Sequence, residues 1–250
     1  MNACCAMRAI LDYPSPNHGP RRAAIDMLIL HYTGMVSARA ALERLCEPTA
    51  KVSAHYLIDE DGTTYRLVPE GRRAWHAGVS SWAGESDINS RSIGIELVNP
   101  GHEFGYRRFP EAQMAALEDL CQGLLSRHPI PRDRVLGHSD VAPSRKRDPG
   151  EFLDWARLAR HGIGLWPTDI DVPEDDVVFE RGARGPLIAR AQRGLARFGY
   201  AAPQSGALDP PTVSVIRAFQ RHFRPSCADG RLDGETSARL DAILRCRGRR

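Results

Sequence analysis

Three residues whose side chains bind metals follow strand-like segments of the chain. His31 comes directly after the apolar run "IDMLIL" at 25–30, and His138 and Asp148 lie in "RVLGHSDVAPSRKRDPG", where a strand-like start becomes a loop. Proteins commonly build sites at strand ends and in the loops that follow them. Two imidazoles and one carboxylate would hold Zn²⁺ with a fourth position open, as in catalytic zinc sites. The alternative is a chance trio of polar loop residues, which nine histidines make easy to assemble.

A carboxylate in the middle of a strand is the candidate acid and base. In "SIGIELV" at 92–98, the isoleucines and Leu97 share one strand face, and Gly94, Glu96 and Val98 share the other. A carboxylate among apolar neighbours is costly to bury without a partner. It suits a general base that takes a proton from a metal-bound water and returns it to a leaving amine. The alternative is a glutamate on a solvent-facing side of the strand.

Lys146 is unusual because almost all basic residues of this chain are arginines. Of 34 basic residues only Lys51 and Lys146 are lysines, and Lys146 stands two residues before Asp148. A compact ammonium near the metal could stabilise the oxyanion that forms when water attacks a carbonyl. The guanidinium of arginine is bulkier than an ammonium and forked, so it is harder to point at a single oxygen atom. The alternative is a solvated charge run formed by Arg145, Lys146 and Arg147.

Apolar patterns along the first 165 residues predict strands alternating with helices. Strands are expected at 25–30 and 92–98, before the loop at 138, and in a hairpin at 54–68 that turns at Asp61-Gly62. Helical spacing covers 37–45, 110–126 and 152–158. This alternation predicts an α/β fold with a mixed central β-sheet flanked by helices.

The rest of the chain predicts a linker and a small three-helix domain. Residues 166–185 contain two prolines and a cluster of acids without a clean period, which is typical of a linker. The motif G-x-L-D-x-x-T then occurs at 206–212 and 230–236, each time before a helical pattern. The first predicted helix, 186–198, is expected to bury Leu187, Ile188, Ala191, Leu195 and Phe198. The predicted domains are therefore 1–165, a linker at 166–185, and 186–250.

Charge and composition narrow the possible partners. The formal net charge is +3, but residues 180–250 carry 14 arginines against six acids, a charge of +8. Such a basic module could meet nucleic acid, anionic lipid or an anionic polymer. No stretch approaches the roughly 18 apolar residues of a membrane span, and no secretory signal is visible. The six cysteines include no C-x-x-C pair, so a thiolate zinc knuckle is not expected, and Cys4 and Cys5 have no assigned role.

The motifs together resemble a known enzyme family. The blocks "LILHYTG", "VSAHYLIDEDGTTYRLV", "AWHAGVSSWAG", "NSRSIGIELVNPG" and "VLGHSDVAPSRKRDPG" are similar to the zinc-dependent N-acetylmuramoyl-L-alanine amidases, which share the fold of peptidoglycan recognition proteins. The resemblance implies hydrolysis of the amide between the lactyl group of N-acetylmuramic acid and L-alanine. It also implies that zinc is bound by His31, His138 and Asp148, that Glu96 is the acid/base, and that Lys146 stabilises the tetrahedral intermediate.

Some positions extend or depart from that resemblance. Phage-type members carry a tyrosine where this chain has Ala54, so Glu96 is expected to carry the proton. Trp75, His76 and Asn89 are expected to line the substrate cleft, although Trp75 could equally belong to the core. The tail from about 186 to 245 resembles the three-helix peptidoglycan-binding domain. Its expected partner is thus peptidoglycan or muropeptides rather than nucleic acid.

The sequence is also compatible with two other functions, and with two cellular locations. A non-catalytic peptidoglycan sensor would share the fold, but such proteins typically lack a complete metal set. A zinc endopeptidase acting on the stem peptide would use the same residues on another bond. A wall-binding tail favours the cell envelope or periplasm, whereas the absence of a visible signal favours the cytoplasm.

Overall fold

The structure, a computed structural model, describes residues 9–172 and 177–247, so Cys4 and Cys5 lie outside the described residues. Its main sheet has the strand order β1-β5-β4-β7-β3-β8, and a second sheet pairs β2 with β6. The strands are β1 (Ile10–Asp12), β2 (His18–Pro20), β3 (Met27–Tyr32), β4 (Tyr56–Ile58), β5 (Thr64–Arg66), β6 (Arg72–Ala74), β7 (Ser92–Leu97) and β8 (Val135–Gly137). Because β3, β4 and β7 pair in parallel while β4 and β5 pair antiparallel, the predicted mixed sheet is confirmed.

The chain divides into two compact units. One comprises residues up to 78 together with 89–131, and the other comprises 79–88 together with the chain from 132 onward. The domain boundaries predicted at 165 and 186 remain predictions.

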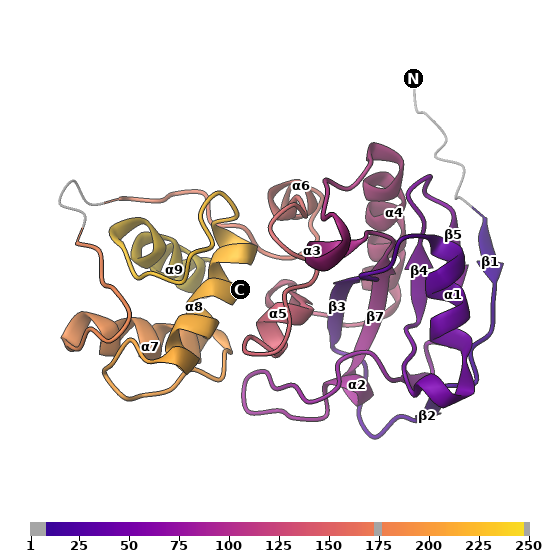
Figure 1. Cartoon of the computed structure of the whole chain (residues 1–250), viewed down its shortest axis with the longest axis horizontal. Coiled ribbons are helices and arrows are strands. Elements are labelled where there is room, and N and C mark those ends of the chain that lie inside the picture. The colour runs from indigo at the N-terminus through magenta and orange to yellow at the C-terminus, as the bar shows by residue number, and fades with distance from the viewer. Residues whose placement is uncertain (1–8, 173–176, 248–250) are drawn as a thin grey trace. The chain divides into compact units, whose positions relative to one another are not determined.

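Helices α1 (Ala38–Cys46) and α4 (Glu111–Arg127) flank the strands of the first unit (Figure 1). The hydroxyl of Ser37 caps α1 by accepting from the Ala40 N–H. Leu42 and Leu45 of α1 then pack with Leu57 of β4 in an apolar cluster. Before the C-terminal module, the described residues also form the short helices η1 (Pro48–Ala50), α2 (Ile88–Arg91), α3 (Gly101–Phe104), η2 (Arg132–Arg134), α5 (His138–Val141) and α6 (Trp155–Arg160).

The predicted hairpin is present between β4 and β5. Ile58 pairs with Thr64, and the Asp59 N–H donates to the Thr63 carbonyl at 2.8 Å, closing a five-residue loop. Gly62 has a φ of 87°, a left-handed conformation that glycine adopts without a steric penalty. The Asp-Gly signal therefore located the turn correctly.

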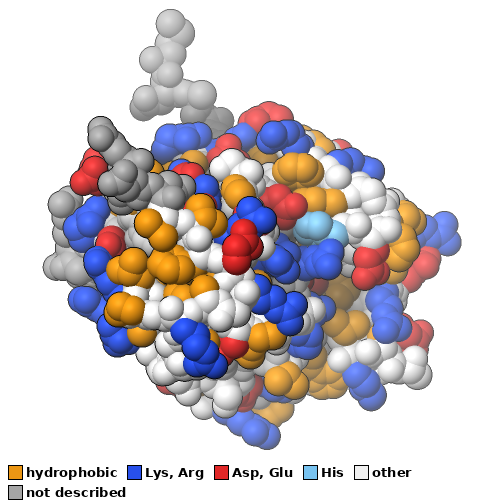
Figure 2. All heavy atoms as spheres, turned by 60° about the vertical axis from the view of Figure 1, so that its left-hand side comes forward, with side chains coloured by type: hydrophobic (Ala, Val, Ile, Leu, Met, Phe, Trp, Pro, Cys, Tyr) orange, Lys and Arg blue, Asp and Glu red, His pale blue; other side chains and the backbone are white. Residues whose placement is uncertain are grey.

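The second unit contains the predicted three-helix module, α7 (Pro186–Phe198), α8 (Pro210–Phe223) and α9 (Gly234–Arg247). Figure 2 turns these helices toward the viewer, and basic side chains are dispersed there among hydrophobic and uncharged ones. Two segments of the predicted linker pair with the module, since Phe179 bridges to Leu232 and Arg184 bridges to Ala207. No helix in the described ranges is long and apolar enough to cross a membrane.

The two G-x-L-D-x-x-T motifs are held by the same pattern of hydrogen bonds. In each, the aspartate caps the next helix by accepting from the threonine N–H, at 2.9 Å and 2.8 Å. A buried glutamine from the preceding helix then clamps the motif, donating to one of its carbonyls and to its threonine hydroxyl and accepting from its glycine N–H. The clamps are Gln192 with Ala207, Thr212 and Gly206, and Gln220 with Arg231, Thr236 and Gly230.

Candidate metal centre

The three predicted metal ligands come together. His31, His138 and Asp148 each offer one ligand atom, and these atoms all lie within 4.8 Å of one another. All three side chains are buried. Two imidazole nitrogens and one carboxylate oxygen form a donor set that fits zinc and supplies three of its usual four ligands. The residues present therefore fit a catalytic zinc site with one position left for water or substrate.

The strand β3 fixes His31, and a second histidine contacts it. Met27 to Leu30 are fully buried, which anchors the strand that carries His31. Nε2 of His31 lies 3.0 Å from Nδ1 of His76, and Nε2 of His76 lies 3.1 Å from the Ser92 hydroxyl. Such outer contacts orient a ligating imidazole and set its tautomer.

Gly94 makes room for that second histidine. A Cβ added at Gly94 would lie 2.5 Å from the His76 ring, closer than real Cβ contacts come. The space beside Glu96 on this strand face is therefore filled by an imidazole.

Glu96 lies beside His31 on the neighbouring strand. The parallel register of β3 and β7 pairs His31 with Glu96, so the two side chains point to the same face of the sheet. Val98, two residues further on, packs on this face with Leu57 in the cluster under α1. Glu96 is only 9% exposed, which rules out a solvent-facing glutamate.

The loop after β8 returns so that Asp148 lies beside His138. Nδ1 of His138 is 2.9 Å from Oδ2 of Asp148, and the Ser139 N–H donates to the Asp148 carbonyl at 2.8 Å. His138 is the first residue of α5, directly after Gly137. The side chain and the backbone thus both tie Asp148 to the start of that helical turn.

Lys146 differs from the arginines on either side of it. Lys146 is half-buried, whereas Arg145 and Arg147 are exposed. The Lys146 N–H donates to the Ala142 carbonyl at 2.9 Å, so the loop turns immediately before Asp148. Arg145 donates to the Val79 carbonyl at 2.8 Å. The three basic residues therefore do not behave as one solvated run.

The residues expected in the substrate cleft have different surroundings. Trp75 is half-buried. His76 is buried against His31. The side-chain oxygen of Asn89 accepts from the backbone N–H groups of His76 and Ala77 at 3.0 Å and 2.8 Å, so Asn89 holds the segment that carries His76. Contact with substrate remains a prediction for all three.

His55 is a buried residue that the sequence analysis did not single out. Its Nδ1 accepts from the Gly94 N–H at 2.9 Å, so the proton of the neutral ring lies on Nε2, which contacts the Arg72 carbonyl at 3.1 Å. The Arg21 guanidinium lies 2.7 Å from the same Nε2. Burial, and next to it the charge of Arg21, lowers the pKa of His55 to about 3. His55 is consequently a neutral structural residue beside the site.

Comparison with known proteins agrees with this geometry. Residues 21–151 match the N-acetylmuramoyl-L-alanine amidase family, and residues 184–240 match a peptidoglycan-binding domain family. The chain is 35% identical to the N-acetylmuramoyl-L-alanine amidase AmiD of Escherichia coli, over 96% of this chain and 92% of that protein.

Two solved structures are similar over almost the whole chain. One is the complex of Escherichia coli AmiD with the substrate anhydro-N-acetylmuramic acid-L-Ala-D-gamma-Glu-L-Lys, with a TM-score of 0.76, 33% identity, and coverage of 92% of this chain and 93% of that chain. The other is AmpDh3 of Pseudomonas aeruginosa in complex with anhydromuramic pentapeptide, with a TM-score of 0.72, 32% identity, and coverage of 97% and 96%.

Proposed function

Because the chain belongs to the N-acetylmuramoyl-L-alanine amidase family, we propose that His31, His138 and Asp148 hold the zinc ion of its hydrolytic site. The enzyme hydrolyses the amide between the lactyl group of N-acetylmuramic acid and L-alanine of the stem peptide. The observation that carries the zinc assignment is the convergence of three buried ligand atoms within 4.8 Å. Zinc bound there would polarise the scissile carbonyl and lower the pKa of a bound water.

The contacts around His31 indicate which ring nitrogen faces the metal. Nε2 is engaged by His76, so Nδ1 is the nitrogen assigned to zinc. The neutral ring then carries its proton on Nε2 and donates it to Nδ1 of His76, which in turn donates from Nε2 to the Ser92 hydroxyl. This chain of donors keeps His31 in the tautomer that a metal requires.

Glu96 is placed to move the proton. Its strand partner is His31, so its carboxylate lies on the face of the sheet that carries a ligand. It takes a proton from the attacking water and returns it to the amino group of L-alanine as the amide breaks. Ala54, which is fully buried, offers no hydroxyl that could share this role.

Lys146 supplies positive charge as the carbonyl oxygen becomes negative. It is half-buried and separated by one residue from Asp148. An ammonium held close to the reacting carbonyl stabilises the tetrahedral state more than the ground state. This difference lowers the barrier of the chemical step.

The substrate class follows from the relatives and from the module. Two similar structures hold anhydromuramyl peptides, and we propose that this chain accepts the same class of muropeptide. The C-terminal module, which matches a peptidoglycan-binding family, would hold the enzyme on its polymer. We therefore propose that the enzyme acts in the cell envelope or periplasm.

Digestion of purified muropeptides, with products identified by mass spectrometry, tests the proposal. We expect intact stem peptides that begin with L-alanine, lost after treatment with a chelator and restored by zinc. Cleavage within the stem peptide would instead identify an endopeptidase, and binding without products would identify a sensor. Anhydromuramyl and reduced muramyl peptides should be compared in parallel, since a preference for one form defines the substrate.

A further inference from the structure

A buried carboxylate next to a metal ligand is held from the C-terminal module. Asp140 stands two residues after His138 and is 1% exposed. Its Oδ2 accepts from the Gly137 N–H at 2.8 Å and from Nδ1 of His222 at 2.7 Å, and its Oδ1 accepts from the Tyr200 hydroxyl at 2.5 Å. A carboxylate this deeply buried depends on such donors. Two of the three come from residues 60 and 82 positions further along the chain.

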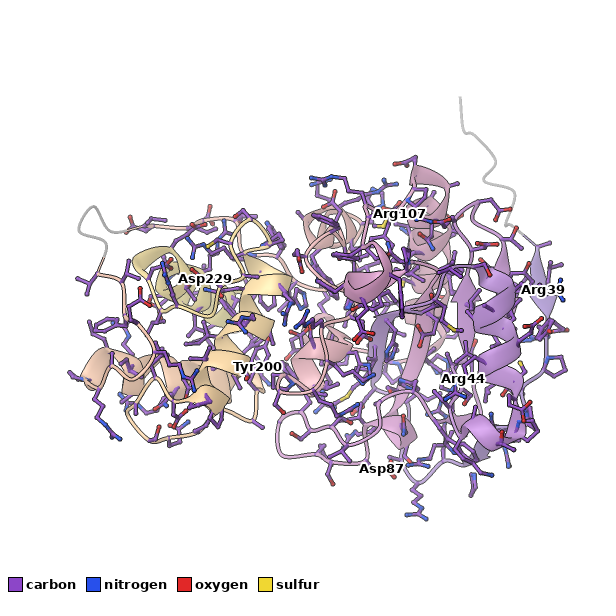
Figure 3. All side chains as sticks on the ribbon, in the orientation of Figure 1. Arg39, Arg44, Asp87, Arg107, Tyr200 and Asp229 are labelled. Atoms are coloured by element: carbon purple, nitrogen blue, oxygen red, sulfur yellow. The ribbon has the colours of Figure 1, made fainter. Side chains whose placement is uncertain are left out.

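The two donors are themselves rigidly held. Tyr200 follows the end of α7, on the side of the module that faces α5 (Figure 3), and it is 3% exposed. His222 lies in the last turn of α8, where its ring stacks on Trp155 with the centroids 3.7 Å apart. Helices α5 and α8 lie side by side. In the described residues, Nε2 of His222 has no hydrogen-bond partner, so the contact with Asp140 is what fixes this ring by hydrogen bonding.

A loop of the same unit reinforces this junction. The Trp82 ring contacts the rings of Phe198 and Tyr200, with centroids 5.6 Å and 4.9 Å apart. Any Cβ at Gly199 would lie 2.4 Å from the Trp82 ring, so only glycine fits there. The Ser81 N–H donates to the Val141 carbonyl at the end of α5. The C-terminal module is therefore packed against α5 rather than joined to it by a linker alone.

The position of His138 depends on this packing because α5 is short. It has only four residues, and a single helical turn is not stable by its own hydrogen bonds. Asp140 ties the turn at its start, through the N–H of Gly137, the residue before the ligand. The orientation of His138 thus rests on a carboxylate that the module holds in place.

We propose that Tyr200 and His222 are positioning residues of the metal site, acting through Asp140 on His138. The C-terminal module then has a second role besides polymer binding, since it completes the support of the ligand loop. The inference rests on the proposed function in that it takes His138 as a zinc ligand.

The test compares zinc binding by full-length variants. Metal-free protein is titrated with zinc in competition with a chromophoric chelator, and the visible spectrum of the cobalt-substituted protein reports the ligand geometry. His222→Leu and Tyr200→Phe should each weaken zinc binding on the order of tenfold and alter the cobalt spectrum. His222→Asn should restore both properties, because the amide nitrogen of asparagine occupies the place of Nδ1.

Gln220→Met is the matched control. Gln220 lies in α8, two residues before His222, and clamps the second repeat without touching Asp140. This variant should weaken the module yet retain the zinc affinity and cobalt spectrum of the parent protein. Parent-like zinc binding by His222→Leu and Tyr200→Phe, or equal loss in Gln220→Met, would overturn the inference. Absence of zinc binding in the parent protein would instead overturn the proposed function. Tyr200→Phe removes a single oxygen atom and keeps the measurement possible if His222→Leu does not fold.

Discussion

Nε2 of His31 lies 3.0 Å from Nδ1 of His76, and the His76 ring occupies the space that the missing side chain of Gly94 leaves open. The sequence suggested His76 as a residue of the substrate cleft. The contact with His31 suggests a second role for His76, which is to hold the tautomer and the orientation of a proposed metal ligand. This relationship leads to the first two predictions.

Replacing His76 should weaken metal binding. His76→Phe keeps a ring in the space beside Gly94 but removes the acceptor for Nε2 of His31, and we expect roughly 10- to 100-fold weaker zinc binding. His76→Asn places an amide group near the position of Nδ1 and should recover part of the affinity. Calorimetric titration of the metal-free variants measures both. Equal affinity in His76→Phe and the parent would show that the contact is incidental.

Adding a methyl group at Gly94 should destabilise the folded protein and weaken zinc binding. The new Cβ would lie 2.5 Å from the His76 ring, so the ring must move or the strand must shift. We expect Gly94→Ala to lose about 1–3 kcal/mol of unfolding free energy and to bind zinc more weakly. Gly71→Ala is the control, since a Cβ at Gly71 meets nothing within 4 Å. Urea unfolding of both variants decides the matter, and indistinguishable midpoints would contradict the steric argument.

Glu96→Gln should abolish most of the activity without removing the metal. The amide has the same size but cannot accept and return a proton, so kcat should fall on the order of 100-fold or more. Zinc content should be unchanged. Glu118→Gln is matched in burial, at 7% exposed against 9% for Glu96, and should retain activity. Near-normal turnover of the Glu96→Gln enzyme would show that another group acts as the acid and base.

Lys146→Arg tests whether the site needs a compact charge. The substitution preserves the positive charge but replaces the ammonium by a forked guanidinium, so we expect kcat to fall roughly tenfold or more while zinc binding persists. The other lysine of the chain, Lys51, is exposed, and Lys51→Arg should behave as the parent enzyme. Steady-state kinetics on a defined muropeptide distinguishes the two. Normal turnover in Lys146→Arg would contradict the claim that a compact ammonium at this position is needed to stabilise the oxyanion.

His55 should make the metal-free protein less stable as the pH falls below about 6.5. Burial and the charge of Arg21 lower its pKa in the folded state to about 3, so between these values the unfolded chain binds a proton that the folded chain does not. The folded state should lose about 2 kcal/mol from this group between pH 7.5 and pH 5. Urea unfolding across this range should show a shallower dependence for His55→Asn. His161→Asn, at an exposed histidine, should keep the slope of the parent protein.

The regular elements of this chain were predictable because their local patterns are strong. The Asp-Gly turn and the apolar spacing of α4 and α7 appear in short windows of sequence, and the structure has these elements where they were expected. The helix predicted at 152–158 begins instead at Trp155, because the Asp154 side chain caps it by accepting from the Arg157 N–H. Leu187 is 52% exposed rather than buried, because it lies beside the stripe formed by Ile188, Ala191 and Leu195.

The supports of the site were not predictable in the same way. The types of His31, His138, Asp148 and Glu96 suggested their chemistry, and β7 placed Glu96 beside His31 once the strands were paired. The contact between His76 and His31 joins residues 45 positions apart, and the contact between His222 and Asp140 joins residues 82 positions apart. No local period encodes such pairs, and Trp82 likewise reads in the sequence as one more apolar residue of a loop.

The two glutamine clamps bear on how the C-terminal module forms. Each joins residues only 10 to 20 positions apart, so the polar contacts that shape both repeats are local in sequence. Chains dominated by contacts of low sequence separation lose little loop entropy on the way to the folded state and fold fast. Closing these two turns therefore costs less loop entropy than the contacts of Tyr200 and His222 with Asp140, which join residues 60 and 82 positions apart.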